Sequence, residues 1–236
     1  MEIKMETEKN LSTKPLISDS EYSSLNEQSL AAWLDYHQRQ VVFDQVTWMG
    51  LPTLKNVLDL WLYQELIFKI KPDRIIEMGS FKGGSTLYLA QLLENIGHGR
   101  VLSIDIDHSQ FKAVHPRITK LTGSTQDPEI IEQVYRECGA EKVMIIHDAD
   151  HSAPMVLADL RSYADLVSKG SYFIVEDGIV DLFAPGTLLG DVMGGPGPLP
   201  ATREFIASDK RFIIDRQCER YLLTYNPNGY LKKISE

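Results

Sequence analysis

The stretch Ile-Ile-Glu-Met-Gly-Ser-Phe-Lys-Gly-Gly-Ser, residues 75–85, joins an apolar run, an acidic residue and a glycine-rich turn. The run 74–78 has the length and composition of a buried parallel strand, and an amphipathic helix is expected at 85–94. Glycines let the backbone turn sharply and approach a ligand closely. The free amides at the start of the helix favour a polar or anionic group. The stretch therefore predicts a nucleotide-type cofactor site at the carboxyl end of a strand.

The spacing of this turn narrows the choice of cofactor. It reads Glu-x-Gly-x-x-x-Gly-Gly-Ser, whereas dinucleotide sites show Gly-x-Gly-x-x-Gly, so it indicates S-adenosylmethionine instead. We expect Glu77 to supply an acceptor that faces the crevice. Asp105 ends the next expected strand, where an acid can accept hydrogen bonds from a ribose diol, or is simply an exposed acid. Ser124 follows the third strand and either flanks the adenine or belongs to a plain turn.

Strand and helix patterns alternate regularly from residue 74 onward. The expected strands are 74–78, 100–105, 117–121, 143–147 and 171–176, and the expected helices are 83–95, 127–138, 155–168 and 200–207. Such alternation predicts a parallel sheet with right-handed crossovers. Residues 212–215 and 221–225 are predicted to form an antiparallel pair. The predicted fold class is α/β: a Rossmann-like class I methyltransferase with a mostly parallel seven-stranded sheet, a C-terminal antiparallel hairpin and an N-terminal helical extension.

The first 45 residues differ from the rest. Residues 1–20 are polar and are expected to be disordered, and 24–40 should form a helix with Leu30, Trp33 and Leu34 on one face. We divide the chain into this extension, 1–45, and an S-adenosylmethionine-dependent methyltransferase domain, 46–236. The extension is expected to pack against the substrate mouth or a neighbouring subunit, which predicts a homo-oligomer. Alternatively, its helix covers its own domain.

A second helix is expected from about residue 54 to 68. Its apolar residues recur at i, i+3, i+4 and i+7, namely Leu54, Val57, Leu58 and Trp61.

Composition excludes several classes of protein. The 236 residues carry 24 basic and 33 acidic side chains, a net charge of −9, so no nucleic-acid partner is expected. The two cysteines, Cys138 and Cys218, are too few for a disulfide framework, which indicates a reducing cytoplasm. No apolar run reaches the ~18 residues that a membrane span needs. The N-terminus lacks the apolar core of a signal peptide.

Acidic residues gather after two of the expected strands. Asp150 follows the fourth strand, and Glu176 and Asp177 end the fifth. Three carboxylates in one crevice repel each other unless a cation binds them, and oxygen ligands suit Mg²⁺. Alternatively, Asp150 caps the helix that begins near residue 153, and the Glu-Asp pair is solvated.

The two nearby histidines raise the question of zinc or of a 2-His-1-carboxylate iron centre. His147 lies on a strand and His151 just past it, which is not a helical metal spacing. His147 is interpreted as a core histidine or one that supports a ligand. His151 is predicted to be a general base or a donor to the substrate, with Asp150 beside it in the catalytic set.

Taken together, these motifs resemble the cephalosporin hydroxylase family from about residue 48 to 233. The motifs are Trp48-Met49-Gly50, Asp59-Leu60-Trp61 with Gln64-Glu65, Glu77-x-Gly79 with Gly83-Gly84-Ser85, Asp148-x-Asp150-His151-Ser152, Glu176-Asp177-Gly178, Gly195-Pro196-Gly197-Pro198, and Thr224-Tyr225-Asn226-Pro227 with Gly229-Tyr230-Leu231.

Despite its name, that family consists of Mg²⁺-dependent O-methyltransferases that use S-adenosylmethionine, in cephamycin biosynthesis and on sugars, including rhamnosyl groups. The resemblance implies Mg²⁺ ligands at Asp150, Glu176 and Asp177. It implies cofactor contacts at Glu77, Gly79, Ser80, Ser85 and Asp105. The predicted cofactor site also includes Gly83, Ser124 and Asp148.

The predicted function is methyl transfer to a hydroxyl of a sugar or natural-product small molecule. A metal would hold two substrate oxygens and lower the pKa of the attacking one. One alternative is an oxygen-dependent hydroxylase, which would normally need two histidines and a carboxylate. A second alternative is a non-catalytic partner of another biosynthetic enzyme, which the intact glycines and carboxylates disfavour.

Overall fold

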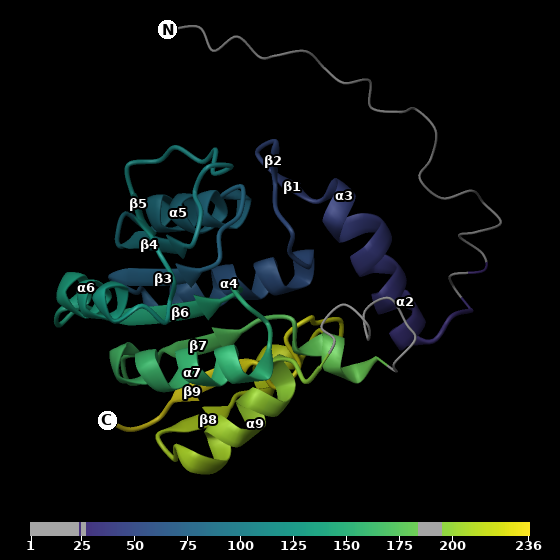
Figure 1. Ribbon diagram of the computed structural model, residues 1–236. Coiled ribbons are helices and arrows are strands. Elements are labelled where there is room, and N and C mark those ends of the chain that lie inside the picture. Colours follow the sequence, from purple (N-terminus) through teal and green to yellow (C-terminus); the bar gives the residue numbers. More distant parts are fainter. Residues whose placement is uncertain (1–23, 25–26, 184–194) are drawn as a thin grey trace, which may run out of the picture.

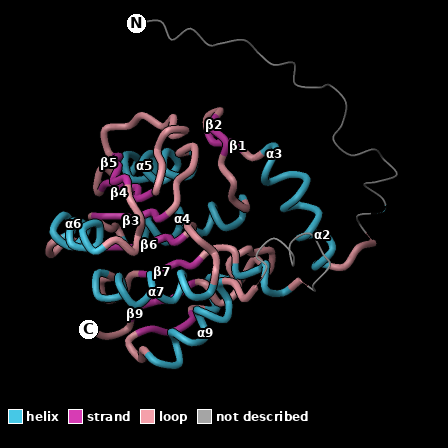
Figure 2. The backbone as a smooth tube through the Cα atoms, in the orientation of Figure 1, coloured by secondary structure: helices cyan, strands magenta, loops and turns pink. Residues whose placement is uncertain are grey.

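The computed structural model describes residue 24, residues 27–183 and residues 195–236 (Figure 1). The strands are β1 (Thr47–Trp48), β2 (Leu51–Pro52), β3 (Arg74–Met78), β4 (Arg100–Asp105), β5 (Ile118–Thr122), β6 (Val143–His147), β7 (Tyr172–Val175), β8 (Phe212–Ile214) and β9 (Tyr230–Lys233). The α-helices are α2 (Leu30–His37), α3 (Phe43–Gln45), α4 (Val57–Ile70), α5 (Gly84–Ile96), α6 (Pro128–Cys138), α7 (Ala153–Tyr163) and α9 (Pro198–Ser208). The π-helix η1 (Gln38–Val42) and the 3-10 helices η2 (Ala164–Leu166), η3 (Gly178–Leu182) and η4 (Arg216–Glu219) complete the described elements. Figure 2 shows how helices, strands and loops follow one another along the backbone.

Seven strands form the main sheet, in the order β5-β4-β3-β6-β7-β9-β8. The strands β3 to β7 are parallel, and β9 pairs antiparallel with both β7 and β8. From β3 the chain first proceeds outward through β4 and β5, and then returns to place β6 on the other side of β3. Ligands of open α/β sheets bind at such a reversal, outside the carboxyl ends of the strands. The predicted fold class is confirmed.

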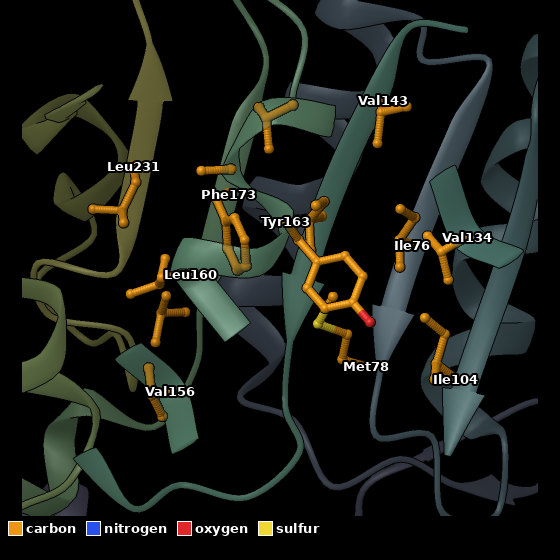
Figure 3. Packing of buried hydrophobic residues seen from close by; sticks show 14 of the residues in the cluster. Ile76, Met78, Ile104, Val134, Val143, Val156, Leu160, Tyr163, Phe173 and Leu231 are labelled. Carbon is orange, nitrogen blue, oxygen red and sulfur yellow. The ribbon is translucent and has the colours of Figure 1, made fainter. Parts of the chain in front are cut away.

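Helices cover both faces of the sheet because alternate strand residues point to opposite sides. One core contains strand residues such as Ile76, Met78 and Phe173, packed against α6, α7 and α9 (Figure 3). The other contains Ile75 and Met144, packed against α4 and α5. The strands β3, β6 and β7 are buried along their whole length and are rich in apolar residues, as expected for parallel strands covered on both faces, which is why their positions were predictable from the sequence. The edge strand β5 is largely exposed. None of the helices in the described part of the chain has the length and hydrophobicity of a membrane span.

The predicted position of the last strand is wrong. Residues 221–225 contain no strand, and the partner of β8 is β9. The segment between β8 and β9 instead forms η4 and a loop, in which Thr224 and the Tyr225 amide hydrogen-bond to the buried Asp59 of α4. The apolar run at 221–225 therefore serves a tertiary contact rather than the sheet.

The apolar stripe noted at the start of α4 is not its buried face. Val57 is 50% exposed and Trp61 is 59% exposed. The sheet is covered instead by Leu60, Leu62, Tyr63, Leu66, Ile67 and Ile70. Because α4 is apolar on more than one side, periodicity alone could not select the side that meets the sheet.

The N-terminal helix packs on its own chain. Leu34 of α2 belongs to an apolar cluster with Ile179, Val180 and Tyr225. The ring of His37 lies 2.6 Å, Nδ1 to hydroxyl oxygen, from Tyr225. Residues 1–23, including those expected to be disordered, lie outside the described residues. The domain division and the homo-oligomer stay predictions, whereas the covering of the chain's own domain is observed.

Candidate active site

A cavity of about 510 Å³ lies at the carboxyl ends of the central strands. Among the predicted cofactor residues, those that line it are Gly79, Ser80, Ser85, Asp105, Ser124 and Asp148. Glu77 and Gly83 are not in the lining. One cavity is thus formed where the glycine-rich turn meets the ends of β4, β5 and β6, as the sequence predicted.

The glycine-rich turn packs directly against the end of β6. Gly79 has φ +81°, and a Cβ built on it would lie 2.0 Å from the carbonyl oxygen of Asp148. The Asp148 amide donates to the Met78 carbonyl at 2.7 Å. Only glycine fits this close approach and this backbone conformation. The turn and the acidic loop after β6 are therefore held as one unit.

Glu77 is fully buried beside this turn. Thr86 donates to its Oε2, while Oε1 has no hydrogen-bond partner among the described residues. Burial raises the pKa of Glu77 to about 7. A buried carboxyl oxygen without a partner is costly, so Glu77 is suited to a donor that a ligand brings.

Asp105 holds the loop that follows Gly79. Its Oδ2 accepts from the amides of Ser80 at 2.8 Å and Phe81 at 3.0 Å, and its Oδ1 accepts from the Asp107 amide at 3.1 Å. The carboxylate thus shapes the cavity wall. Its role toward a ribose stays a prediction.

A compact polar cluster lies beside the cavity, formed by Asp148, His151 and Asp177. One ligand-type atom from each of the three falls within 4.8 Å of the others. His151 Nε2 lies 3.2 Å from Asp148 Oδ1 and 3.3 Å from Asp177 Oδ2. Burial disfavours the charged imidazole, but hydrogen bonds to the two carboxylates outweigh it and raise the pKa of His151 to about 10. The ends of β6 and β7 therefore do converge, as expected for neighbouring parallel strands.

Lys55, from the loop before α4, joins this cluster and was missed by sequence reasoning. Its Nζ donates to Glu176 Oε2 at 2.7 Å and also to Asp148. Burial alone would lower the pKa of Lys55, but Asp148, Glu176 and Glu77 raise it, so the lysine is an ammonium. Burial raises the pKa of Glu176, and the Lys55 charge acts against that shift.

Asp150 lies outside this cluster. It is exposed, and its Oδ1 accepts from the Ser152 amide at 2.8 Å, immediately before α7. It does line the cavity. This is the local, cap-like contact that the sequence left open as an alternative, and the role of Asp150 as a metal ligand stays a prediction.

A buried network supports the acidic pair at the end of β7. Tyr63 donates to Glu176 Oε1 at 2.8 Å, and Asn226 donates to the Tyr63 hydroxyl at 3.0 Å. The Asn226 side-chain oxygen accepts from the amide of Asp177 at 3.1 Å, where the backbone is left-handed with φ +58°. Sequence reasoning gave Asn226 no role. Its place in the quoted motif Thr224-Tyr225-Asn226-Pro227 was the signal that could have drawn attention to it.

His147 is fully buried, with Nε2 2.8 Å from Asp159 Oδ2. This agrees with its interpretation as a core histidine.

A model of the family described as rhamnosyl O-methyltransferase/CmcI matches residues 40–234. The chain belongs to this family. A rhamnosyl O-methyltransferase of Mycobacterium bovis (strain BCG / Pasteur 1173P2) is 32% identical over 214 residues, which cover 84% of this chain and 83% of that protein. A rhamnosyl O-methyltransferase of Mycobacterium leprae is 37% identical over 151 residues, covering 61% of this chain and 66% of that protein.

Solved structures of CmcI share the fold. One described as "cmcI-D160 Mg-SAM" has a TM-score of 0.62 at 20% identity and covers 83% of this chain and 79% of that chain. Another, "cmcI-N160 SAH", has a TM-score of 0.58 at 18% identity and covers 82% of this chain and 84% of that chain. Family membership confirms the predicted enzyme class, an S-adenosylmethionine-dependent O-methyltransferase. The hydroxylase and the non-catalytic partner gain no support from it.

Proposed function

We propose that this member of the rhamnosyl O-methyltransferase/CmcI family methylates a hydroxyl of a sugar or sugar-bearing natural product, and that it requires Mg²⁺. The observation that carries the proposal is the meeting of Asp148, Glu176, Asp177 and His151 beside the cofactor cavity. The names of the relatives, rhamnosyl O-methyltransferases, support a sugar acceptor.

The residues present fit a hard divalent cation. Carboxylate oxygens are the ligands that Mg²⁺ prefers, and it retains water or substrate oxygens in its remaining positions. The site already attracts positive charge, since Lys55 and His151 both contact its carboxylates. We propose Glu176 and Asp177 as ligands, as the sequence predicted. For the third ligand, the geometry supports Asp148 rather than Asp150.

The cavity walls fit the cofactor in the predicted way. We propose that Gly79, Ser80, Ser85 and Ser124, which line the cavity, contact S-adenosylmethionine and that Asp105 meets the ribose. The contact predicted for Glu77 also stays a proposal, because its unpartnered Oε1 is buried beside the turn and is not in the cavity lining. Asp148 lies both in this cavity and in the acidic cluster. It therefore brings the methyl donor and the acceptor site together.

A bound Mg²⁺ supplies Lewis-acid chemistry that acidifies an acceptor hydroxyl, and S-adenosylmethionine supplies the methyl group. His151 Nε2 is the atom proposed to accept the hydroxyl proton. For this the imidazole must be neutral, and the pKa of about 10 that its contacts with Asp148 and Asp177 give it falls when a cation neutralises those carboxylates. Asp148 and Asp177 hold the imidazole in place from two sides, while Tyr63 and Asn226 hold Glu176 and Asp177. Rigid placement of this kind aligns the acceptor oxygen with the reacting carbon and removes much of the entropic barrier.

Transfer of label from S-[methyl-³H]adenosylmethionine to a panel of rhamnosides and other glycosides tests the proposal. We expect transfer to at least one sugar hydroxyl, loss of turnover in EDTA, and recovery with Mg²⁺. The His151→Ala variant should lose about 10²–10⁴-fold in kcat while it keeps its affinity for S-adenosylhomocysteine. Full activity in EDTA would contradict the metal requirement, and activity restored only by Fe²⁺ with O₂ consumption would revive the hydroxylase.

A further inference from the structure

Lys55 occupies the position in the acidic cluster where the proposed function requires a divalent cation. Lys55 is only 4% exposed, and its ammonium contacts one oxygen of Glu176 and one of Asp148. The neighbouring Asn56 accepts the Leu58 amide as the N-cap of α4 and donates to the Leu223 carbonyl at 2.6 Å. The lysine therefore enters the cluster from an anchored backbone.

The charges in the cluster explain why a cation is needed there. Asp148, Glu176 and Asp177 stand close together, and like charges in such a place destabilise each other. Glu176 is buried, and the side chains of Asp148 and Asp177 are 22% and 25% exposed. In the described part of the chain, the cationic groups that contact these three carboxylates are Lys55 and His151. Lys55 joins the carboxylates of two different strands, since Asp148 follows β6 and Glu176 follows β7.

We propose that Lys55 is a positioning residue that assembles the carboxylates before the divalent cation binds, and that it then competes with the cation for the same oxygens. This inference rests on the proposed metal dependence. Two cations that share carboxylates in a partly buried site repel each other. The ammonium therefore stabilises the metal-free enzyme and weakens its affinity for the metal.

The Lys55→Met variant separates these two effects. Methionine retains an unbranched chain but removes the charge, so the carboxylates lose their internal partner. Without metal, the variant should melt at a lower temperature than the wild type. Its dissociation constant for Mn²⁺ or Mg²⁺ should fall by about tenfold or more, because a like charge has been removed from the metal's surroundings. The rise of melting temperature on adding metal should be larger than in the wild type, since stabilisation grows with ligand concentration over dissociation constant.

Lys82→Met is the matched control. Lys82 also lines the cavity, but its Nζ lies over the Phe81 ring, 4.9 Å from the centroid, and it contacts none of the three carboxylates. Its loss should leave metal affinity unchanged. Isothermal titration calorimetry with Mg²⁺, and electron paramagnetic resonance with Mn²⁺, measure the affinity directly. S-adenosylhomocysteine can be present throughout to support the fold.

A measurement on the wild-type protein does not depend on the variant folding. A buried ammonium gives a ¹⁵N-lysine side-chain NMR signal that exchanges slowly with water. The Lys55 signal should shift or disappear as Mg²⁺ is titrated, with the same midpoint as calorimetry. A purely structural lysine would keep its signal.

Each outcome decides between the two proposals. Tighter metal binding by Lys55→Met, with a Lys55 signal that responds to Mg²⁺, supports the competition. Equal or weaker binding, or a signal that ignores Mg²⁺, overturns it but leaves the metal-dependent function standing. If Lys55→Met binds Mg²⁺ and the wild type does not, the competition is supported, but Mg²⁺ is not the native cofactor. Binding by neither protein overturns both.

Discussion

Exchanging one acidic ligand candidate for its amide should distinguish Asp148 from Asp150. Both residues lie in the loop after β6, and both line the cavity. They differ in what their carboxylates contact. Asp148 meets Lys55 and His151 within the acidic cluster, whereas Asp150 is exposed and accepts only the Ser152 amide among the described residues.

The structure sets the expected size of each effect. Asparagine keeps the shape of Asp148 but removes the charge that its cationic neighbours and a metal require. Hydrogen bonds to charged groups contribute about 1.5–3 kcal/mol each. Asp148→Asn should therefore raise the metal dissociation constant by roughly 10-fold to 150-fold, at 1.4 kcal/mol per factor of ten. For Asp150→Asn the free energy of metal binding should change by no more than about 0.5 kcal/mol, as for other surface substitutions. The side-chain oxygen of asparagine can still accept from the Ser152 amide.

Calorimetric titration of Mg²⁺ into each variant, saturated with S-adenosylhomocysteine, measures both constants. Circular dichroism and the affinity for S-adenosylhomocysteine serve as controls for folding. If Asp150→Asn loses the metal and Asp148→Asn keeps it, the geometric argument is refuted and the ligand set predicted from the sequence stands.

Three further predictions concern the cofactor side of the site. Gly79→Ala should lower the free energy of unfolding by about 2–4 kcal/mol, because φ is +81° and the new Cβ would meet the Asp148 carbonyl; urea denaturation curves that overlay those of the wild type would contradict this. Asp105→Ala should weaken S-adenosylhomocysteine binding by about 1–3 kcal/mol and also lower the melting temperature, since Asp105 holds two loop amides; an unchanged calorimetric affinity would exclude a ribose contact. Glu77 has a pKa raised from 4.5 to about 7, so the folded protein binds this proton more tightly than the unfolded chain and loses stability as pH rises through that window. Glu77→Gln should remove this loss, and parallel stability-pH curves for the two proteins would count against it.

Much of the fold could be predicted because its signals are local. The bounds of β3, β4 and β6 coincide with the predicted strands, since strands buried on both faces need continuous apolar residues. The turn after β3 was readable because few residues other than glycine adopt its backbone conformation. Acids at the ends of β6 and β7 had to meet, because neighbouring parallel strands deliver their carboxyl ends to one edge of the sheet.

The sequence by itself thus determined the fold class, the place of the cofactor turn and the gathering of acids at one edge. Only the tertiary structure decided which side of α4 is buried, where the last strand lies, and that Asp148 rather than Asp150 faces Asp177. It also brought Lys55 to Glu176, 121 residues later, and Asn226 to Tyr63, 163 residues earlier. Periodicity and composition report on the chain near each residue, whereas these contacts depend on how packed layers bring distant segments together and on which way each side chain turns within a loop.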